Sequence, residues 1–242
     1  VNTTTLSAVE NIPRKHWIVS FGQLCRKQPL GAAGALIVLV MLLATVFANV
    51  LSPYDPEAAS FEHMLMPPSA DFWFGTDAFG RDILTRIIYG ARAALFVGCT
   101  AALVGATVGL VLGVASAYYG GLFDLIFQRV VDVVMAFPLI VLALAIVATL
   151  GASTVNVIIA ITIPFIPQCA RVVRSSALAI REIPYVDAAR ALGFGHARII
   201  LRHMVPNVMA PYLIMLTTFV GHAILLEASL SYLGLGVQEP TP

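Results

Sequence analysis

Long runs without any charged residue constrain this chain more than any other feature of its sequence. Between Arg92 and Asp124 lie 31 uncharged residues, and between Asp132 and Arg171 lie 38. A helix needs roughly 20 apolar residues to cross the hydrocarbon layer of a membrane, where a helix satisfies its own backbone hydrogen bonds. The first run is long enough for one crossing and the second for two. The pattern predicts an all-α, polytopic membrane protein.

Composition points the same way. Hydrophobic residues make up 59% of the chain and charged residues 11%, with a mean hydropathy of +0.90. Soluble domains are about 45–50% apolar and about 25% charged. This difference excludes a soluble enzyme, a disordered tail and a nucleic-acid-binding domain. The three cysteines, Cys25, Cys99 and Cys169, have no paired spacing and predict neither a disulfide framework nor a zinc site.

The uncharged runs, with a turn over residues 151–154, predict four spans: 30–51, 93–118, 130–150 and 155–170. A fifth is expected over 208–230, which carries a charge inside its apolar run. The first is longer than the apolar core of a signal peptide, so we expect it to stay as an anchor. The sequence begins with Val1 rather than Met and ends at Pro242 without a terminal helix. We therefore expect a sixth span to follow.

The positions of Lys and Arg predict the orientation. If the N-terminus is cytoplasmic, 11 of the 14 basic residues lie inside, and only Arg81, Arg86 and Arg92 lie outside. Basic residues near span ends favour the cytoplasmic side. The chain then divides into a cytoplasmic segment 1–29, a first transmembrane helix 30–51, an external segment 52–90 and a membrane core 91–242. The core includes a polar cytoplasmic region, 171–207.

The chain lacks the motifs of covalent chemistry. Its only lysines, Lys15 and Lys27, precede the first span, so a phosphate-binding loop of the G-x-x-x-x-G-K-[ST] type is excluded. No cluster of His, Cys and carboxylates has the spacing of metal ligands. We expect no catalytic residue, metal or cofactor in this chain, and an energy source that is a gradient or another subunit.

The external segment carries six acidic residues and is long for a loop without function. Thr76 or Asp77 is expected to cap a helix that runs to about residue 89, in which Asp82 and Arg86 could pair. Asp77, Arg81 and Asp82 are candidates for docking an external partner. A purely structural hairpin is the alternative.

The cytoplasmic region predicts two short helices. Pro184 suits a first helical position, Asp187 would lie in the first turn, and Gly193 and Gly195 would end that helix. A second helix over about 196–204 would precede Pro206. Two small residues, Ala188 and Ala189, are expected on an exposed face that lets another surface approach. An interfacial helix lying on anionic lipid would also explain the arginines.

The spacing in this region resembles the E-A-A-x3-G-x9-I-x-L-P signature of ABC importer permeases. It reads Asp187-Ala188-Ala189, three residues, Gly193, nine residues, His203, one residue, Val205-Pro206. Asp, His and Val depart from the signature, and His203 departs most. Segments 74–77, 80–84, 89–92 and 227–237 resemble the peptide/nickel branch. The chain is most similar to the second permease subunit of dipeptide and oligopeptide importers.

The resemblance implies a type I ABC importer transmembrane fold with six spans, in a bacterial or archaeal cell membrane. It implies a sister permease, two ATPase subunits that hold ATP and Mg, and an extracytoplasmic substrate-binding protein. It implies no nucleic-acid partner. The helix from Asp187 to Gly193 would be the coupling helix, and alternating access would follow its movement. The residues assigned to ATPase coupling are Tyr185, Asp187, Ala188, Ala189, Gly193, His203 and Pro206.

Within the spans, Pro138, Pro164 and Pro167 interrupt the backbone ladder, while Gly105, Gly109 and Gly113 suit close helix contact. Ionisable side chains in spans are costly. His222 and Glu227 are candidates for the substrate path or a gate, with an interhelical hydrogen bond as the alternative.

Three transport functions stay open. They are peptide import, import of nickel or a chelate by the same branch, and a gradient-driven secondary transporter. The third is disfavoured because the first, second and fourth spans hold no ionisable relay and the chain shows no repeat.

Overall fold

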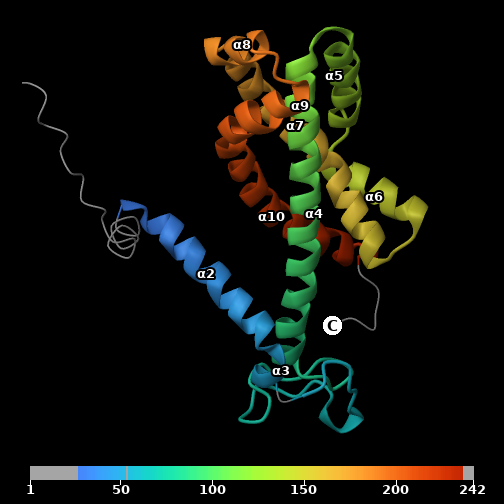
Figure 1. Ribbon diagram of the computed structural model, residues 1–242. Coiled ribbons are helices and arrows are strands. Elements are labelled where there is room, and N and C mark those ends of the chain that lie inside the picture. The colour runs from blue at the N-terminus through green and yellow to red at the C-terminus, as the bar shows by residue number, and fades with distance from the viewer. Residues whose placement is uncertain (1–26, 53, 237–242) are drawn as a thin grey trace, which may run out of the picture. The chain divides into compact units, whose positions relative to one another are not determined.

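The structure, a computed structural model, describes residues 27–52 and 54–236 of the 242-residue chain. Helices account for all the regular structure in these residues (Figure 1). The chain forms two compact units, 1–51 and 52–242. Four described helices are long and apolar enough to cross a membrane, or five crossings if one bent pair counts as a span. Cys25 and most of the predicted segment 1–29 lie outside the described residues.

The first unit contains α2 (Pro29–Val46) and α3 (Ala48–Leu51). Pro29 stands in the first turn of α2, where no backbone N–H is needed. α2 has no charged residue, and most of its side chains are exposed. A helix that is apolar on all sides fits a hydrocarbon environment, as expected for the predicted span over 30–51.

The second unit is built on α4 (Ile83–Tyr119), a single helix of 37 residues and about 56 Å in length. The prediction that Thr76 or Asp77 caps this helix was wrong. Asp82 is the N-cap, and its carboxylate accepts a hydrogen bond from the backbone N–H of Thr85 at 2.8 Å. The helix starts later because residues 77–81 form a turn that is closed by the Asp77 side chain.

The expected third span is a bent pair, α5 (Gly121–Met135) and α6 (Leu139–Leu150), whose axes differ by 87°. The predicted interruption at Pro138 is confirmed, since this residue cannot continue the helix before it. The predicted start at residue 130 was wrong. α5 already begins at Gly121, directly after a turn in which Gly120 has a φ of +63°.

α7 (Thr154–Arg181) packs along α4, and both Pro164 and Pro167 lie inside it. The predicted close contact of the α4 glycines is confirmed. A Cβ on Gly109 would lie 2.6 Å from the Cβ of Cys169, and one on Gly113 would lie 2.6 Å from the carbonyl oxygen of Ala170. The backbones of α4 and α7 can therefore approach only because these positions have no side chain.

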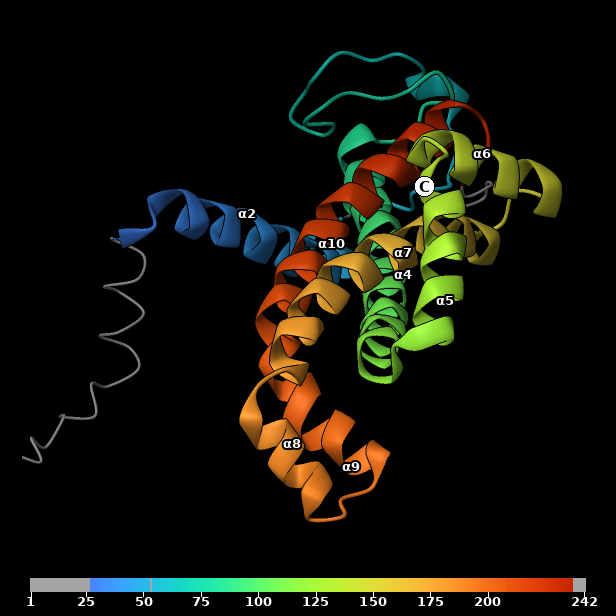
Figure 2. The ribbon, with the colours of Figure 1, turned by 90° about the horizontal axis from the view of Figure 1, so that it is seen from above.

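Of the predicted cytoplasmic region, residues 171–181 continue α7, and residues 184–208 fold as α8 (Pro184–Ala191), α9 (His196–Ile199), a π-helical turn (Ile200–Met204) and a 3-10 turn (Val205–Val208). It leads into α10 (Met209–Tyr232), which matches the predicted span over 208–230. α10 packs against α4 and α7, with Phe219 and Phe165 stacked at 4.2 Å between ring centroids. Figure 2 shows α8 and α9 together beyond one end of α7 and α10.

Candidate functional site

α8 begins and ends where the sequence predicts. Ile183 is the N-cap, and Pro184 occupies the first turn. At the other end Gly193 has a φ of +75° and donates its N–H to the carbonyl of Arg190 at 2.9 Å. The N–H of Phe194 reaches the carbonyl of Ala189 at 3.1 Å. These two bonds form a Schellman motif, which ends the helix sharply and favours glycine at its left-handed position.

The exposed face of α8 is narrower than the sequence predicts. Asp187 and Ala188 are exposed, and Tyr185 is 37% exposed. Ala189 is only 4% exposed, so the prediction that both alanines are on the surface was wrong for this one. It lies three residues after the buried Val186, on the same side of the helix. Asp187 is within 3.0 Å of Arg190 on the same helix.

A hydrogen-bond cluster ties α8 to the segment that leads into α10. The Tyr185 hydroxyl donates to the carbonyl of His203 at 2.8 Å. The Asn207 side-chain amide donates to the same carbonyl at 2.7 Å and to the Tyr185 hydroxyl at 3.0 Å. Pro206, beside them, is exposed. Asn207 was missed from the sequence because one of its partners, Tyr185, lies on a helix 22 residues earlier.

The cytoplasmic region is also joined to the inner end of α4. The hydroxyl of Tyr118 lies 2.7 Å from Nδ1 of His196, and the guanidinium of Arg190 stands over the Tyr118 ring at 5.3 Å. Arg181 donates to the carbonyl of Ala117 at 2.8 Å. These contacts connect α4, α7, α8 and α9, so α8 is anchored to the membrane helices by more than its two chain ends.

Two ion pairs fasten α5 to α7 near this end. Arg174 donates from Nε and Nη2 to the carboxylate of Asp124, the first bond measuring 2.6 Å. Ser116 on α4 also donates to Asp124. Asp132 lies 2.5 Å from Arg171 of α7 and 4.0 Å from Arg129 of its own helix. The closer partner is thus 39 residues away in the sequence.

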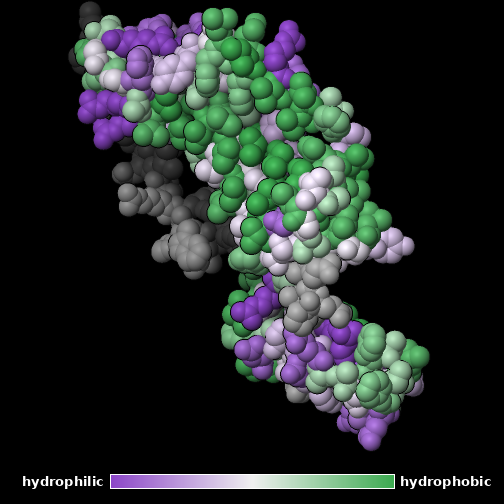
Figure 3. All heavy atoms as spheres, turned by 90° about the vertical axis from the view of Figure 1, so that its right-hand side faces the viewer, coloured by the Kyte–Doolittle hydropathy of each residue, from purple (hydrophilic) through white to green (hydrophobic). Residues whose placement is uncertain are grey.

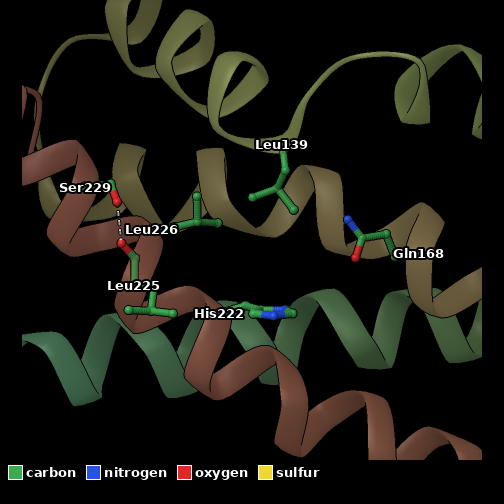
Figure 4. Close-up of a pocket in the computed structure, with 6 residues that line it drawn as sticks. All are labelled: Leu139, Gln168, His222, Leu225, Leu226 and Ser229. Atoms are coloured by element: carbon green, nitrogen blue, oxygen red, sulfur yellow. Dashed lines mark hydrogen bonds between the residues drawn. The ribbon is translucent and has the colours of Figure 1, made fainter.

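His222 lines an open depression with a volume of about 380 Å³ (Figure 4). The other lining residues come from α6, α7 and α10: Leu139, Gln168, Leu225, Leu226 and Ser229. Glu227 is not among them, because five residues of helix turn a side chain by about 140° relative to His222. Of the two path candidates, the structure therefore places only His222 in this depression, and Gln168, which the sequence analysis did not single out, lies there as well.

In the external segment, Asp77 organises the turn before α4. Its carboxylate accepts from the N–H of Phe79 at 2.8 Å, the N–H of Arg81 at 2.9 Å and Nε of Arg81 at 2.8 Å. Burial opposes ionisation of Asp77, but the bonds from Arg81 and Phe79 outweigh it and lower its pKa. Arg86 lies 3.8 Å from the same carboxylate. Asp82 is buried as the α4 cap, so Asp77 and Arg81 present more surface than Asp82 does.

The surface divides into polar ends and an apolar middle. On the face in Figure 3, hydrophilic residues gather at the two ends of the second unit, and hydrophobic ones cover the part between. This is the distribution expected of a protein surrounded by hydrocarbon. Over residues 27–52 and 54–236, no group of three or more His, Cys, Asp or Glu side chains is placed to hold a metal ion.

Comparison with known proteins places these features in context. Residues 105–241 match the family described as the binding-protein-dependent transport system inner membrane component. Residues 23–68 match the N-terminal transmembrane domain of oligopeptide transport permease C. The two matches together cover the first span, part of the external segment and the helical core from residue 105 onward.

Individual relatives are similar over most of the chain. A Brucella suis protein with the provisional name of peptide transport system permease is 49% identical over 84% of this chain and 69% of its own length. The dipeptide transport system permease protein of Alkalihalophilus pseudofirmus is 43% identical over 93% of this chain and 74% of its own. The glutathione transport system permease protein of Escherichia coli is 39% identical over 90% of this chain and 72% of its own.

Proposed function

Because this chain belongs to the family of binding-protein-dependent transport system inner membrane components, we propose that it is a permease subunit of an ATP-driven importer for di- or oligopeptides. It is a multi-pass inner-membrane protein and not an enzyme; ATP hydrolysis belongs to separate subunits. The names of the three relatives refer to peptides, a dipeptide and glutathione, which is itself a tripeptide. This agreement is the observation that supports peptides as the substrate class.

Permeases of this family work with ATPase subunits, a substrate-binding protein and another permease. We assign two ATPase subunits, which hold ATP and Mg, to the cytoplasmic face. The N-terminus then lies in the cytoplasm and the external segment 52–90 outside, in a bacterial or archaeal membrane. Asp77 and Arg81 are the side chains we assign to docking the binding protein.

α8 is the segment we assign to the ATPase. Its residues Tyr185, Asp187 and Ala188 are exposed, and Gly193 gives it a sharp end. The Tyr185–His203–Asn207 cluster holds α8 against the start of α10. A push on α8 would therefore reach α10 directly, which is what alternating access needs from a coupling helix.

Transport in proteoliposomes tests the substrate class. The assembled importer, with its binding protein outside and ATP inside, should accumulate labelled dipeptides and should leave nickel in the medium. Uptake of nickel or a chelate without uptake of peptide would favour the alternative within the same branch. Uptake of peptide without ATP, driven by an ion gradient, would overturn the ATP-driven reading.

A charge on α8 tests coupling. Ala188→Asp adds a carboxylate to the exposed face without filling any buried space. We expect it to reduce the ATPase stimulation caused by loaded binding protein by about tenfold. A new carboxylate that is buried in the interface with the ATPase, or that faces a charge of the same sign there, weakens the contact by about 1–3 kcal/mol. Ala197→Asp, on the exposed side of α9, is the matched control. Equal stimulation in both variants would remove α8 from the coupling assignment.

A further inference from the structure

Two side chains in the depression have no hydrogen-bond partner among residues 27–52 and 54–236: Gln168 on α7 and His222 on α10. Figure 4 shows them reaching into the depression from different helices, with Leu139 approaching from the start of α6. An amide or imidazole left unpaired in hydrocarbon is unfavourable, because it loses the hydrogen bonds that water would supply. Lipid is therefore a poor occupant of this face.

The same side of α7 carries a charge one turn closer to the cytoplasm. Arg171 follows Gln168 by three residues, and its partner Asp132 lies seven residues before Leu139 on the other side of the bend. Both side chains of this pair are about half exposed, 45% for Arg171 and 52% for Asp132. A half-exposed ion pair needs water or another polar group around it. We call His222, Gln168, Arg171 and Asp132 the polar strip.

We propose that the polar strip lines the inner half of the peptide path and that Gln168 and His222 hydrogen-bond the main chain of the passing peptide. This inference rests on the proposed function and names residues for it. An amide and an imidazole each donate and accept, which matches the alternating N–H and C=O groups that all peptides share. Leu139, Leu225 and Leu226 beside them offer apolar contact without fixed shape.

The charged end of the strip suits the same cargo. A peptide zwitterion carries one ammonium and one carboxylate, and Asp132 and Arg171 present one charge of each sign. Gln168 and His222 come before this pair on the way to the cytoplasm. The strip would thus exclude lipid, accept side chains of many shapes and still recognise the backbone and the ends of a peptide.

Transport measurements with the complete importer test the contact. The double variant Gln168→Leu/His222→Leu keeps similar volume and removes the polar groups. We expect kcat/KM for dipeptide uptake to fall about 10- to 100-fold, as the loss of two hydrogen bonds predicts. ATPase stimulation by loaded binding protein should stay within about twofold. Thr217→Val is the control, because the Thr217 hydroxyl bonds its own helix and lies on another side of α10.

Cysteine labelling tests whether the polar strip is accessible to water. In a Cys25→Ser/Cys99→Ser background, Gln168→Cys and His222→Cys should react with a charged thiol reagent in at least one nucleotide state, and saturating dipeptide should slow the reaction. Thr217→Cys should show no protection by peptide. Unchanged uptake in the double variant overturns the proposal, as does a strip that stays unlabelled in every state because the sister permease or lipid covers it.

The two tests separate this inference from the proposed function. If the unaltered importer moves no peptide, the proposed function fails, whatever the labelling shows. If it moves peptide while the double variant matches the Thr217→Val control, the function stands and the polar strip is not its path.

Discussion

The two ends of α4 are held in different ways. At the outer end, the bonds of Asp77 and Asp82 reach residues two to four positions away in the sequence. At the inner end, Tyr118 contacts a residue 78 positions away, and the Asp124–Arg174 pair joins residues 50 positions apart. The side-chain caps of the outer end are thus local, although the hydroxyl of Ser52 also donates to that of Thr85 at 2.9 Å from 33 residues earlier. The inner end exists only when four helices meet, and movement of α8 would enter the membrane there.

Between the ends, α4 depends on glycine. A substitution in the middle of the contact with α7 should have the largest effect, because it would force the two helices apart along their main packing surface. Gly109→Leu would place side-chain atoms where Cys169 and the carbonyl of Ile166 already lie, 2.6 and 2.8 Å from an added Cβ. We expect loss of the assembled complex, measured as the yield of monodisperse protein after detergent extraction.

Gly221→Ala is the matched control for this substitution. No atom lies within 4 Å of a Cβ added at Gly221, which is on the exposed side of α10. Alanine there should be neutral or stabilising by roughly 0.5–1 kcal/mol, because glycine inside a helix is unfavourable. If Gly109→Leu assembled as well as this control, the close packing of α4 on α7 would be wrong.

Breaking the inner end should have an intermediate effect. Arg174→Ala leaves the mostly buried carboxylate of Asp124 with Ser116 as its remaining partner. We expect a loss of about 1–3 kcal/mol in stability, visible as a lower melting temperature of the purified complex. Arg129→Ala, which removes a long and exposed contact to Asp132, should change stability by less than about 0.5 kcal/mol. Equal shifts in the two variants would show that Asp124–Arg174 is not a junction.

Acid should affect the outer end, with the smallest effect of the three. Because hydrogen bonds lower the pKa of Asp77 in the folded protein, its ionised form stabilises the turn above the unfolded pKa near 3.8. This contribution disappears as the pH falls through the lower, folded value. It should amount to less than about 1 kcal/mol because Asp77 is partly exposed.

Asp77→Asn removes the titrating group and keeps much of its shape. Over the range from pH 5 to 2, the protection of the amides of residues 77–82, measured against the intrinsic exchange rate at each pH, should fall in the unaltered protein and change less in this variant. The same loss of protection in both proteins would mean that Asp77 does not carry the pH dependence of the turn.

The sequence predicts what is local and misses what is paired over distance. Charge-free runs located the apolar parts of α2, α4 and α7, and Pro184 with Gly193 bounded α8 because proline and glycine act on their own backbone. The start of α4 was misplaced because Thr76, Asp77 and Asp82 are all good caps, and only the turn through Arg81 selects the last. Asn207, Gln168 and the Asp132–Arg171 pair depend on partners or surfaces from other helices, which no local pattern contains.

The length of α4 has a mechanical consequence. Its 37 residues extend about 56 Å, against a hydrocarbon layer of about 30 Å. A rod that overshoots the bilayer cannot tilt at one surface without swinging at the other. In the proposed orientation, a single unbroken helix would therefore join the side where a binding protein would arrive to the side where nucleotide would be consumed.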